Sequence, residues 1–254
     1  MNSKLSLAIV FPCALAACLR PEEVTQDDPP PVVTALCTEA TEVPCRDDSL
    51  VDLSMNAEDV APGLIDNEAL ADGFHTSIDA TAGGAFNGQD GYVYGKFTNA
   101  GLVKVEITDD ASFESMDWDV SFRRFVIRLN SGTGGPSCVT AARTAVDTDF
   151  ATSEFDTSLL EFNAEQYMSE GTCDLIPDGS GLQSAGVVLQ GFWRYPGCVQ
   201  MTGNVYLVSL ADGRLVKLLV THFYHDAAQQ ECQETDTTDS DGSGNIQLDW
   251  AFLD

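Results

Sequence analysis

The chain has 254 residues, of which 12 are basic and 40 are acidic, so its formal net charge is −28. This charge argues against nucleic acid as a partner, because a phosphate backbone would be repelled. The length suits one large all-β domain or two small ones, and an apolar content of 44% can supply a core. The acidity is typical of solubility in an extracellular medium, with an acidic binding face as the alternative.

The first residues are typical of an export signal. Lys4 precedes the apolar run 5–17, which is too short to span a bilayer and ends in small residues. Leu15-Ala16-Ala17-Cys18 resembles a bacterial lipobox, which implies cleavage before Cys18 and lipidation of that residue; a plain secretory signal is the alternative. Leu19, rather than an aspartate, follows the cysteine. We therefore expect a lipid anchor in the outer membrane, on its periplasmic or extracellular face.

The composition predicts three segments. Residues 1–17 are expected to be a lipoprotein signal peptide, and residues 18–48 a tether that begins at lipidated Cys18 and is rich in proline and acids. Residues 49–254 are expected to form one β domain. No later run of about 18 apolar residues is present, so nothing else in the sequence is predicted to span a bilayer.

From residue 76 onwards the pattern is β. The stretch 91–99 is aromatic and bounded at its start by glycine, which predicts a strand. The stretch 101–110 follows, and its alternation predicts a strand with one apolar face formed by Val103, Val105 and Ile107.

The next strand changes face partway along. Apolar residues first alternate on one parity, as at Trp118 and Phe122, and then on the other, as at Ile127 and Leu129. One extra residue in a strand produces this shift, so we interpret Arg123-Arg124 as a β-bulge. A bulge there would aim the glycine-rich segment that follows.

Residues 131–185 are poorly patterned, apart from a possible short helix over 158–171. Unstructured stretches of this length inside a compact domain are more often functional than accidental.

The strongest signal is a hairpin near the end of the chain. Two β-rich runs flank Ala211-Asp212-Gly213-Arg214, and Asp-Gly favours the left-handed backbone of a tight turn. The last strand is predicted to place Ile246, Leu248, Trp250 and Phe252 on one face.

Six cysteines remain after Cys13 leaves with the signal and Cys18 is lipidated. An even number in an exported chain indicates up to three disulfides, which the sequence alone cannot pair. We expect Cys37 to bond with Cys45, because the two are close together in a tail with little else to order it. The other candidates are Cys138, Cys173, Cys198 and Cys232.

Motifs for catalysis are missing from the sequence: it has no nucleophile elbow, phosphate loop or zinc-protease motif. We therefore expect a protein that is not an enzyme. Residues 239–246 resemble the start of an EF-hand loop through Asp239, Asp241 and Ser243, but Trp250 stands where a bidentate glutamate is needed. A glycine-rich turn is the favoured interpretation, with a calcium site as the alternative.

Two segments together resemble the HmuY family of bacterial haem-binding lipoproteins, over roughly residues 76–254. One is the hairpin 205–219. The other is a tryptophan-aspartate motif, carried here by Trp118, Asp119, Phe122, Arg124, Asn130, Gly132 and Gly135. The resemblance implies an all-β domain of antiparallel sheets and hairpins, whose long loops grip the ligand.

The resemblance also implies a function. Members of the family capture haem outside the cell and pass it to a TonB-dependent outer-membrane receptor. They bind the iron through two axial His or Met side chains, one soon after the Asn-Gly turn and one from a later loop. Residues 131–150 hold no His or Met, so the candidates here are Met168, Tyr167 and Met201. By the same resemblance, a Cys138–Cys173 disulfide would join the two loops.

The sequence therefore predicts a lipid-anchored protein that binds haem or a related tetrapyrrole for uptake through an outer-membrane receptor. The alternative is a surface protein of the same fold that contacts another protein or a glycan and binds no haem.

Overall fold

The computed structural model describes residues 37–82, 91–152, 154–182 and 184–253. The predicted signal peptide, Cys18 and the first part of the predicted tether lie outside these residues. No helix within the described ranges is long and apolar enough to cross a membrane.

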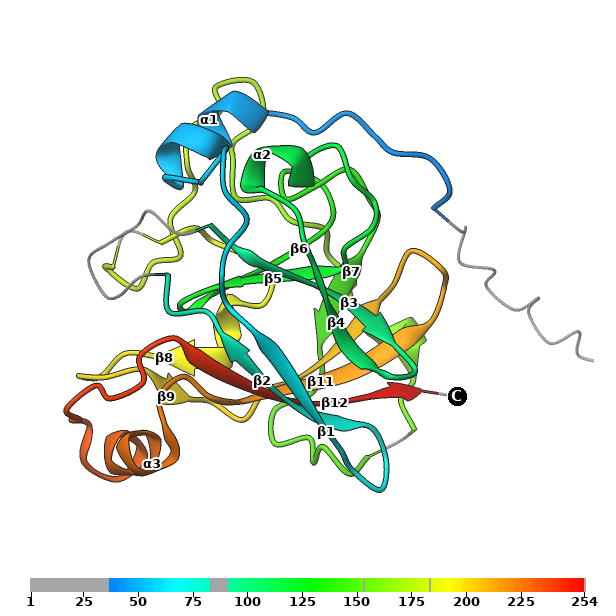
Figure 1. Cartoon of the computed structure of the whole chain (residues 1–254). Helices are drawn as coiled ribbons and strands as arrows, with labels where there is room; N and C mark the ends of the chain where they lie inside the picture. The colour runs from blue at the N-terminus through cyan, green and yellow to red at the C-terminus, as the bar shows by residue number, and fades with distance from the viewer. Residues whose placement is uncertain (1–36, 83–90, 153, 183, 254) are drawn as a thin grey trace, which may run out of the picture. The chain divides into compact units, whose positions relative to one another are not determined.

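Twelve strands and a few short helices make up the described chain (Figure 1). In chain order they are α1 (Arg46–Asp52), β1 (Ile65–Ala69), β2 (Phe74–Asp79), β3 (Val93–Thr98), β4 (Gly101–Val105), α2 (Asp109–Ser112), β5 (Val120–Arg123), β6 (Val126–Leu129), β7 (Thr140–Arg143), the 3-10 turns η1 (Thr157–Leu159) and η2 (Gln190–Phe192), β8 (Trp193–Arg194), β9 (Gln200–Met201), β10 (Val205–Ser209), β11 (Leu215–His222), α3 (Asp226–Thr235) and β12 (Asn245–Leu253).

The strands form two main antiparallel sheets, which confirms the all-β prediction. The larger sheet has the order β1-β2-β12-β11-β10-β7, and the smaller has the order β4-β3-β5-β6. A two-stranded sheet, β8-β9, stands beside them. In Figure 1, β5 and β6 of the smaller sheet lie above β1, β2 and β12 of the larger one.

The main core lies between the two sheets. Trp250 of β12 is completely buried, and its ring meets Phe97 of β3 edge-on, with the centroids 4.9 Å apart. Ile246 and Leu248 are buried on the same face of β12, and Phe252 packs against that core. The predicted face of the last strand is thus confirmed, because burial of one sheet face requires period-two alternation.

The predicted hairpin is also confirmed. Strand β10 pairs with β11 from Val205↔Leu219 to Ser209↔Leu215. Gly213 in the connecting turn has φ 85°, a left-handed conformation that glycine adopts without steric cost.

The change of face at Arg123-Arg124 is a hairpin, so the predicted bulge is wrong. Strands β5 and β6 pair antiparallel, and Arg123 lies opposite Val126. A two-residue turn reverses the chain there, with Arg124 at φ 52°. Reversal shifts the parity of the apolar positions as a bulge would, which is why Phe122 and Ile127 both reach the core.

The predicted apolar face of β4 is wrong in part. Leu102 is buried in the main core, whereas Val103 is 49% exposed. Val105 and Ile107 pack on the opposite side of the small sheet, against a cluster that contains Trp118. The small sheet is therefore covered on both sides, and a strand of that kind does not show simple alternation.

The possible helix over 158–171 is not present. Its first residues overlap η1, and isolated bridges then pair Asn163 with Ala141 and Met168 with Leu175, before a turn at residues 170–172.

Gly135 sits where no side chain fits. A methyl group added to it would lie 2.2 Å from Oδ1 of Asn130, which is buried and accepts a hydrogen bond from the amide of Ser137. We expect Gly135→Ala to lower the free energy of unfolding by about 3 kcal/mol, because the clash also displaces a buried hydrogen bond. Urea denaturation measures the change.

Gly171→Ala is the matched control. The added methyl group there meets nothing within 4 Å, and only the left-handed backbone at φ 83° opposes it. We expect a loss of about 1 kcal/mol. Equal losses in the two variants would contradict the close packing at Gly135.

Candidate ligand-binding loops

The long connection between β7 and β8 carries the main candidate site. The first part of this connection, with the end of β7, encloses a groove of about 670 Å³, within the size range of small-molecule sites. Its described lining residues are Arg143, Thr144, Ala145, Asp147, Thr148, Asp149, Thr152, Glu154, Phe155, Asp156, Leu159 and Leu160.

The lining of this groove is both apolar and charged. Phe155, Leu159 and Leu160 supply an apolar surface, and the side chain of Leu159 is 80% exposed. Of the described lining residues, Arg143 alone is cationic, whereas four are carboxylates. The groove can therefore receive an apolar ring system, with Arg143 as the available partner for an anionic substituent.

A buried guanidinium fixes the later part of the connection. Arg128 of β6 is completely buried, and its Nη1 donates to the hydroxyl of Tyr167 at 3.1 Å. Its Nη2 donates to the hydroxyl of Tyr94 at 2.9 Å. The carbon of the guanidinium lies 4.1 Å from the centre of the Tyr92 ring. Two hydrogen bonds and a cation–π contact thus compensate in part for the lost hydration of the charge, whereas its buried Nε has no hydrogen-bond partner.

Asp109 supplies the opposite charge. It is buried, and its Oδ1 accepts hydrogen bonds from the Tyr94 hydroxyl at 2.8 Å and from the Tyr92 amide at 2.9 Å. Its Oδ2 accepts from the amide of Asn56 at 2.8 Å. The chain Arg128–Tyr94–Asp109 therefore joins the small sheet to α2 and to the segment before β1.

Glu165 holds the same loop from its other side. Its carboxylate accepts from the amide of Leu129 at 2.9 Å and from the amide of Val188 at 3.1 Å. Its own carbonyl oxygen accepts from the amide of Thr133 at 3.0 Å, where Gly132 leaves room for it. Burial raises the pKa of the Glu165 carboxyl from 4.5 to about 7.

The two disulfides of the structure differ from the pairings expected above. Cys45 bonds with Cys173, and Cys198 bonds with Cys232. The expected pairs Cys37–Cys45 and Cys138–Cys173 are both wrong, because Cys45 precedes α1 and the fold brings it to the distant loop that carries Cys173.

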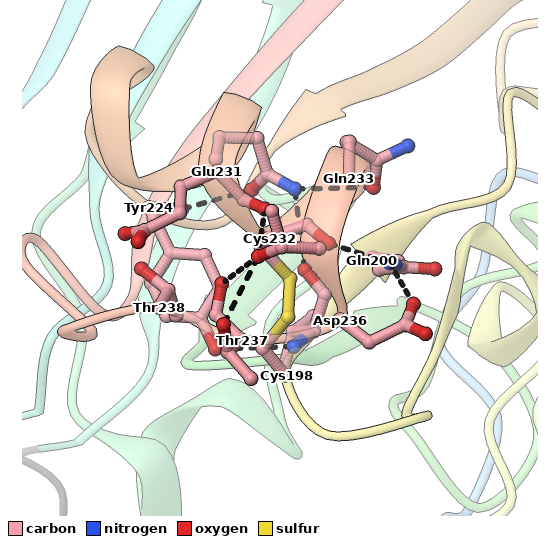
Figure 2. The surroundings of a disulfide bond; sticks show 12 residues. Cys198, Gln200, Tyr224, Glu231, Cys232, Gln233, Asp236, Thr237 and Thr238 are labelled. Atoms are coloured by element: carbon pink, nitrogen blue, oxygen red, sulfur yellow. Dashed lines mark hydrogen bonds between the residues drawn. A yellow bond between two sulfur atoms is a disulfide. The ribbon is translucent and has the colours of Figure 1, made fainter.

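Figure 2 shows the second disulfide, which joins the segment before β9 to α3. Beside it, Nε2 of Gln200 donates to the carbonyl oxygen of Cys232 and, at 2.8 Å, to Oδ1 of Asp236. The short helix α3 is thereby fixed to the two-stranded sheet.

None of the predicted axial ligands lines the groove. Met168 is completely buried, within an apolar cluster that includes Leu53 and Val187. Tyr167 is also completely buried, with its hydroxyl bound to Arg128. Met201 lies in β9, where the side-chain amide of Gln233 binds both its backbone amide and its carbonyl oxygen. The donors present do not fit an axial pair on a haem iron at this groove.

The residues of the possible calcium site are engaged within a turn. Oδ1 of Asp239 accepts from the amide of Asp241, whose own Oδ2 lies 3.2 Å from Nδ1 of His225. The hydroxyl of Ser243 donates to the carbonyl oxygen of Ser240 at 2.7 Å. Within the described ranges, no group of three or more His, Cys, Asp or Glu side chains is placed to hold a metal ion.

Sequence reasoning missed Arg128, Asp109 and Glu165. Arg128 alternates with the core residues Ile127 and Leu129, so it reads as solvent-facing on a strand with one covered face. The second face is covered by segments far away in the chain, and the local pattern carries no signal of that.

Comparison with known proteins identifies the class. The model of the HmuY protein family matches residues 88–235, which is more than half of the chain. A search of curated protein sequences found no match. The chain belongs to the HmuY family.

Three solved structures resemble the chain at low identity. One, named for an HmuY-like haem-binding protein from Bacteroides vulgatus, is 16% identical, with a TM-score of 0.43 over 70% of this chain and 90% of that one. A structure named for a lipoprotein of Bacteroides fragilis is 13% identical, with a TM-score of 0.40 over 72% and 93%. The apo HmuY analogue of Tannerella forsythia is 17% identical, with a TM-score of 0.36 over 78% and 100%.

The raised pKa of Glu165 predicts a pH dependence of stability. Its folded pKa of about 7 exceeds the ordinary value of 4.5, so its contribution to stability is complete below about pH 4.5 and is lost as the pH rises through 7. Ionisation of this buried group costs on the order of 3 kcal/mol. Urea denaturation at about pH 5 and about pH 8 measures the loss.

Glu165→Gln is the control, since its side chain stays neutral. Burial also raises the pKa of Asp119, to about 6, so Asp119 contributes a loss of stability in the same direction. This contribution is present in both the wild type and the variant. We expect the variant to lose less stability than the wild type between these pH values. Parallel losses would show that Glu165 does not ionise in this range.

Proposed function

We propose that this member of the HmuY family is a non-enzymatic, lipid-anchored binding protein for haem or a related tetrapyrrole. The ligand occupies the groove between Arg143 and Leu160, and the protein delivers it to a TonB-dependent outer-membrane receptor. Lipidation at Cys18 holds the protein at the outer membrane. Membership of the HmuY family is the observation that carries the proposal.

The chemistry of the groove supports a flat, largely apolar ligand. Phe155, Leu159 and Leu160 offer apolar surface, of which Leu159 is the most exposed part. The guanidinium of Arg143, which lines the groove, suits a carboxylate of the ligand. The four carboxylates of the lining disfavour further negative charge, so the proposal assigns one acidic group of the ligand to Arg143 and leaves the rest in solvent.

The lining also limits the mode of binding. It contains no His or Met among the described residues, and Met168 and Tyr167 are occupied in buried contacts. We therefore propose that the ligand is held by burial of its apolar ring and by Arg143, and we assign no axial ligand to the iron.

A second candidate function has its own support. Val146 is 71% exposed and Leu159 is 80% exposed, and both lie on the loop that forms the groove. Exposed apolar side chains of this kind are typical of a surface that contacts another macromolecule. The alternative is therefore a surface interaction protein that binds a protein or a glycan and no haem.

Titration of the purified protein with haem and with iron-free protoporphyrin distinguishes these functions. We expect a saturable shift of the Soret band with both, because binding does not require a bond to iron. Arg143→Gln is expected to weaken both affinities about tenfold, since a charge-assisted hydrogen bond is lost. Arg194→Gln, a change at an exposed arginine of β8, is the matched control and should bind like the wild type.

Two outcomes would contradict the proposal. Absence of a shift with either tetrapyrrole would leave the surface interaction function. A shift with haem alone, lost in Met168→Leu, would show that the buried loop opens and that Met168 binds the iron.

A further inference from the structure

Two cysteines of the described chain are not joined in a disulfide, although the other four are paired. They are Cys37 and Cys138, and both are half-buried. Burial, together with a hydrogen bond with the Cys37 thiol, raises the pKa of the Cys138 thiol to about 12. The two thiols are therefore neighbours, although 100 residues separate them in the sequence.

The backbone explains why they meet. The amide of Cys37 donates to the carbonyl oxygen of Ala211 at 3.1 Å. Strand β7 pairs with β10 so that Thr140 lies opposite Ser209. Cys138 lies two residues before Thr140, and Ala211 lies two residues after Ser209, in the turn between β10 and β11. Both cysteines therefore lie near the end of β10, one in the N-terminal segment and one in the residues before β7.

A second contact fixes the N-terminal segment in this place. The amide and the hydroxyl of Thr41 both donate to the carbonyl oxygen of Pro136, at 2.9 Å and 3.0 Å. Residues 37–41 therefore run beside residues 136–138 and are held at both ends. Two cysteines that are fixed in contact in this way need little backbone movement to form a bond.

We propose that Cys37 and Cys138 form a third disulfide in the exported protein. The sulfur–sulfur bond forms as the two thiols together lose two protons and two electrons. The electrons pass to a disulfide oxidant, such as an oxidised thiol–disulfide oxidoreductase, whose own sulfur–sulfur bond breaks to give two thiols. The thiolate of one cysteine first attacks the oxidant and forms a mixed disulfide. The thiolate of the other cysteine then attacks this bond and displaces the oxidant as a thiol.

The bond would fix the start of the domain. With Cys45–Cys173, it would join the segment 37–45 covalently to the body of the protein at both of its ends. In the reduced state, the first residues of this segment are held by the hydrogen bonds at Ala211 and Pro136. The proposed disulfide therefore determines whether the N-terminal segment that begins at Cys37 can separate from the loop that follows Gly135.

Peptide mapping of the exported full-length protein tests the proposal. The protein is incubated with oxidised glutathione, alkylated under denaturing conditions and digested without reduction. We expect a peptide pair joined through Cys37 and Cys138, lighter by two hydrogens than the sum of the free thiol peptides. Mild reduction should release two alkylatable thiols at these positions.

Single variants keep the test independent of any loss of stability. Cys37→Ser should leave one alkylatable thiol, at Cys138, and Cys138→Ser should leave one at Cys37, while Cys45–Cys173 and Cys198–Cys232 persist. Recovery of Cys37 and Cys138 as alkylated thiols from oxidised, folded wild-type protein would overturn the proposal. A disulfide-linked peptide pair that joins Cys37 or Cys138 to any other cysteine of the chain would also overturn the proposal.

Discussion

The buried positive charge of Arg128 is the constraint on which the packing of the long β7–β8 connection depends. A guanidinium removed from water is costly unless its protons and its charge are satisfied within the fold. Here the hydroxyls of Tyr94 and Tyr167 accept its hydrogen bonds and the ring of Tyr92 lies against it, while Asp109 supplies the opposite charge through Tyr94. The packing of each of these groups is therefore coupled to that of the others. Displacement of one would expose the Arg128 guanidinium to solvent or leave it buried without a partner.

This coupling determines what the long connection can offer to a ligand. Tyr167 is bound to Arg128, and the neighbouring Glu165 is bound to Leu129 and Val188, so Met168 is held inside an apolar cluster. The side chains left for a ligand come from the earlier part of the connection, which begins at Arg143. This chain thus combines the fold of the HmuY family with a long connection in which the sulfur of Met168 is buried.

The sequence predicted those parts of the fold that local patterns specify. The β10–β11 hairpin was accessible because Asp212-Gly213 stands between two alternating runs, and the face of β12 because one side of it is buried. The change of parity at Arg123 was visible, but a bulge and a two-residue turn shift the pattern alike, and arginine is not a typical turn residue. Resemblance in two motifs identified the family.

The remaining features depend on contacts between distant segments. Cys45 meets Cys173, and Arg128 meets Tyr167, only because the chain folds back over the outer face of the small sheet. A local reading places Arg128 in solvent and Met168 in an open loop. The candidate donors were therefore recognised by residue type, whereas their burial is a property of the tertiary structure.

Amide hydrogen exchange with and without haem is the most direct test of this account. Its central claim is that the core formed by Arg128, Glu165 and their partners stays closed when the ligand binds. The account predicts that the amides of Leu129 and Val188, both bound to Glu165, remain protected at saturating haem. Loss of their protection on haem binding would show that the loop opens to the ligand and would contradict the account.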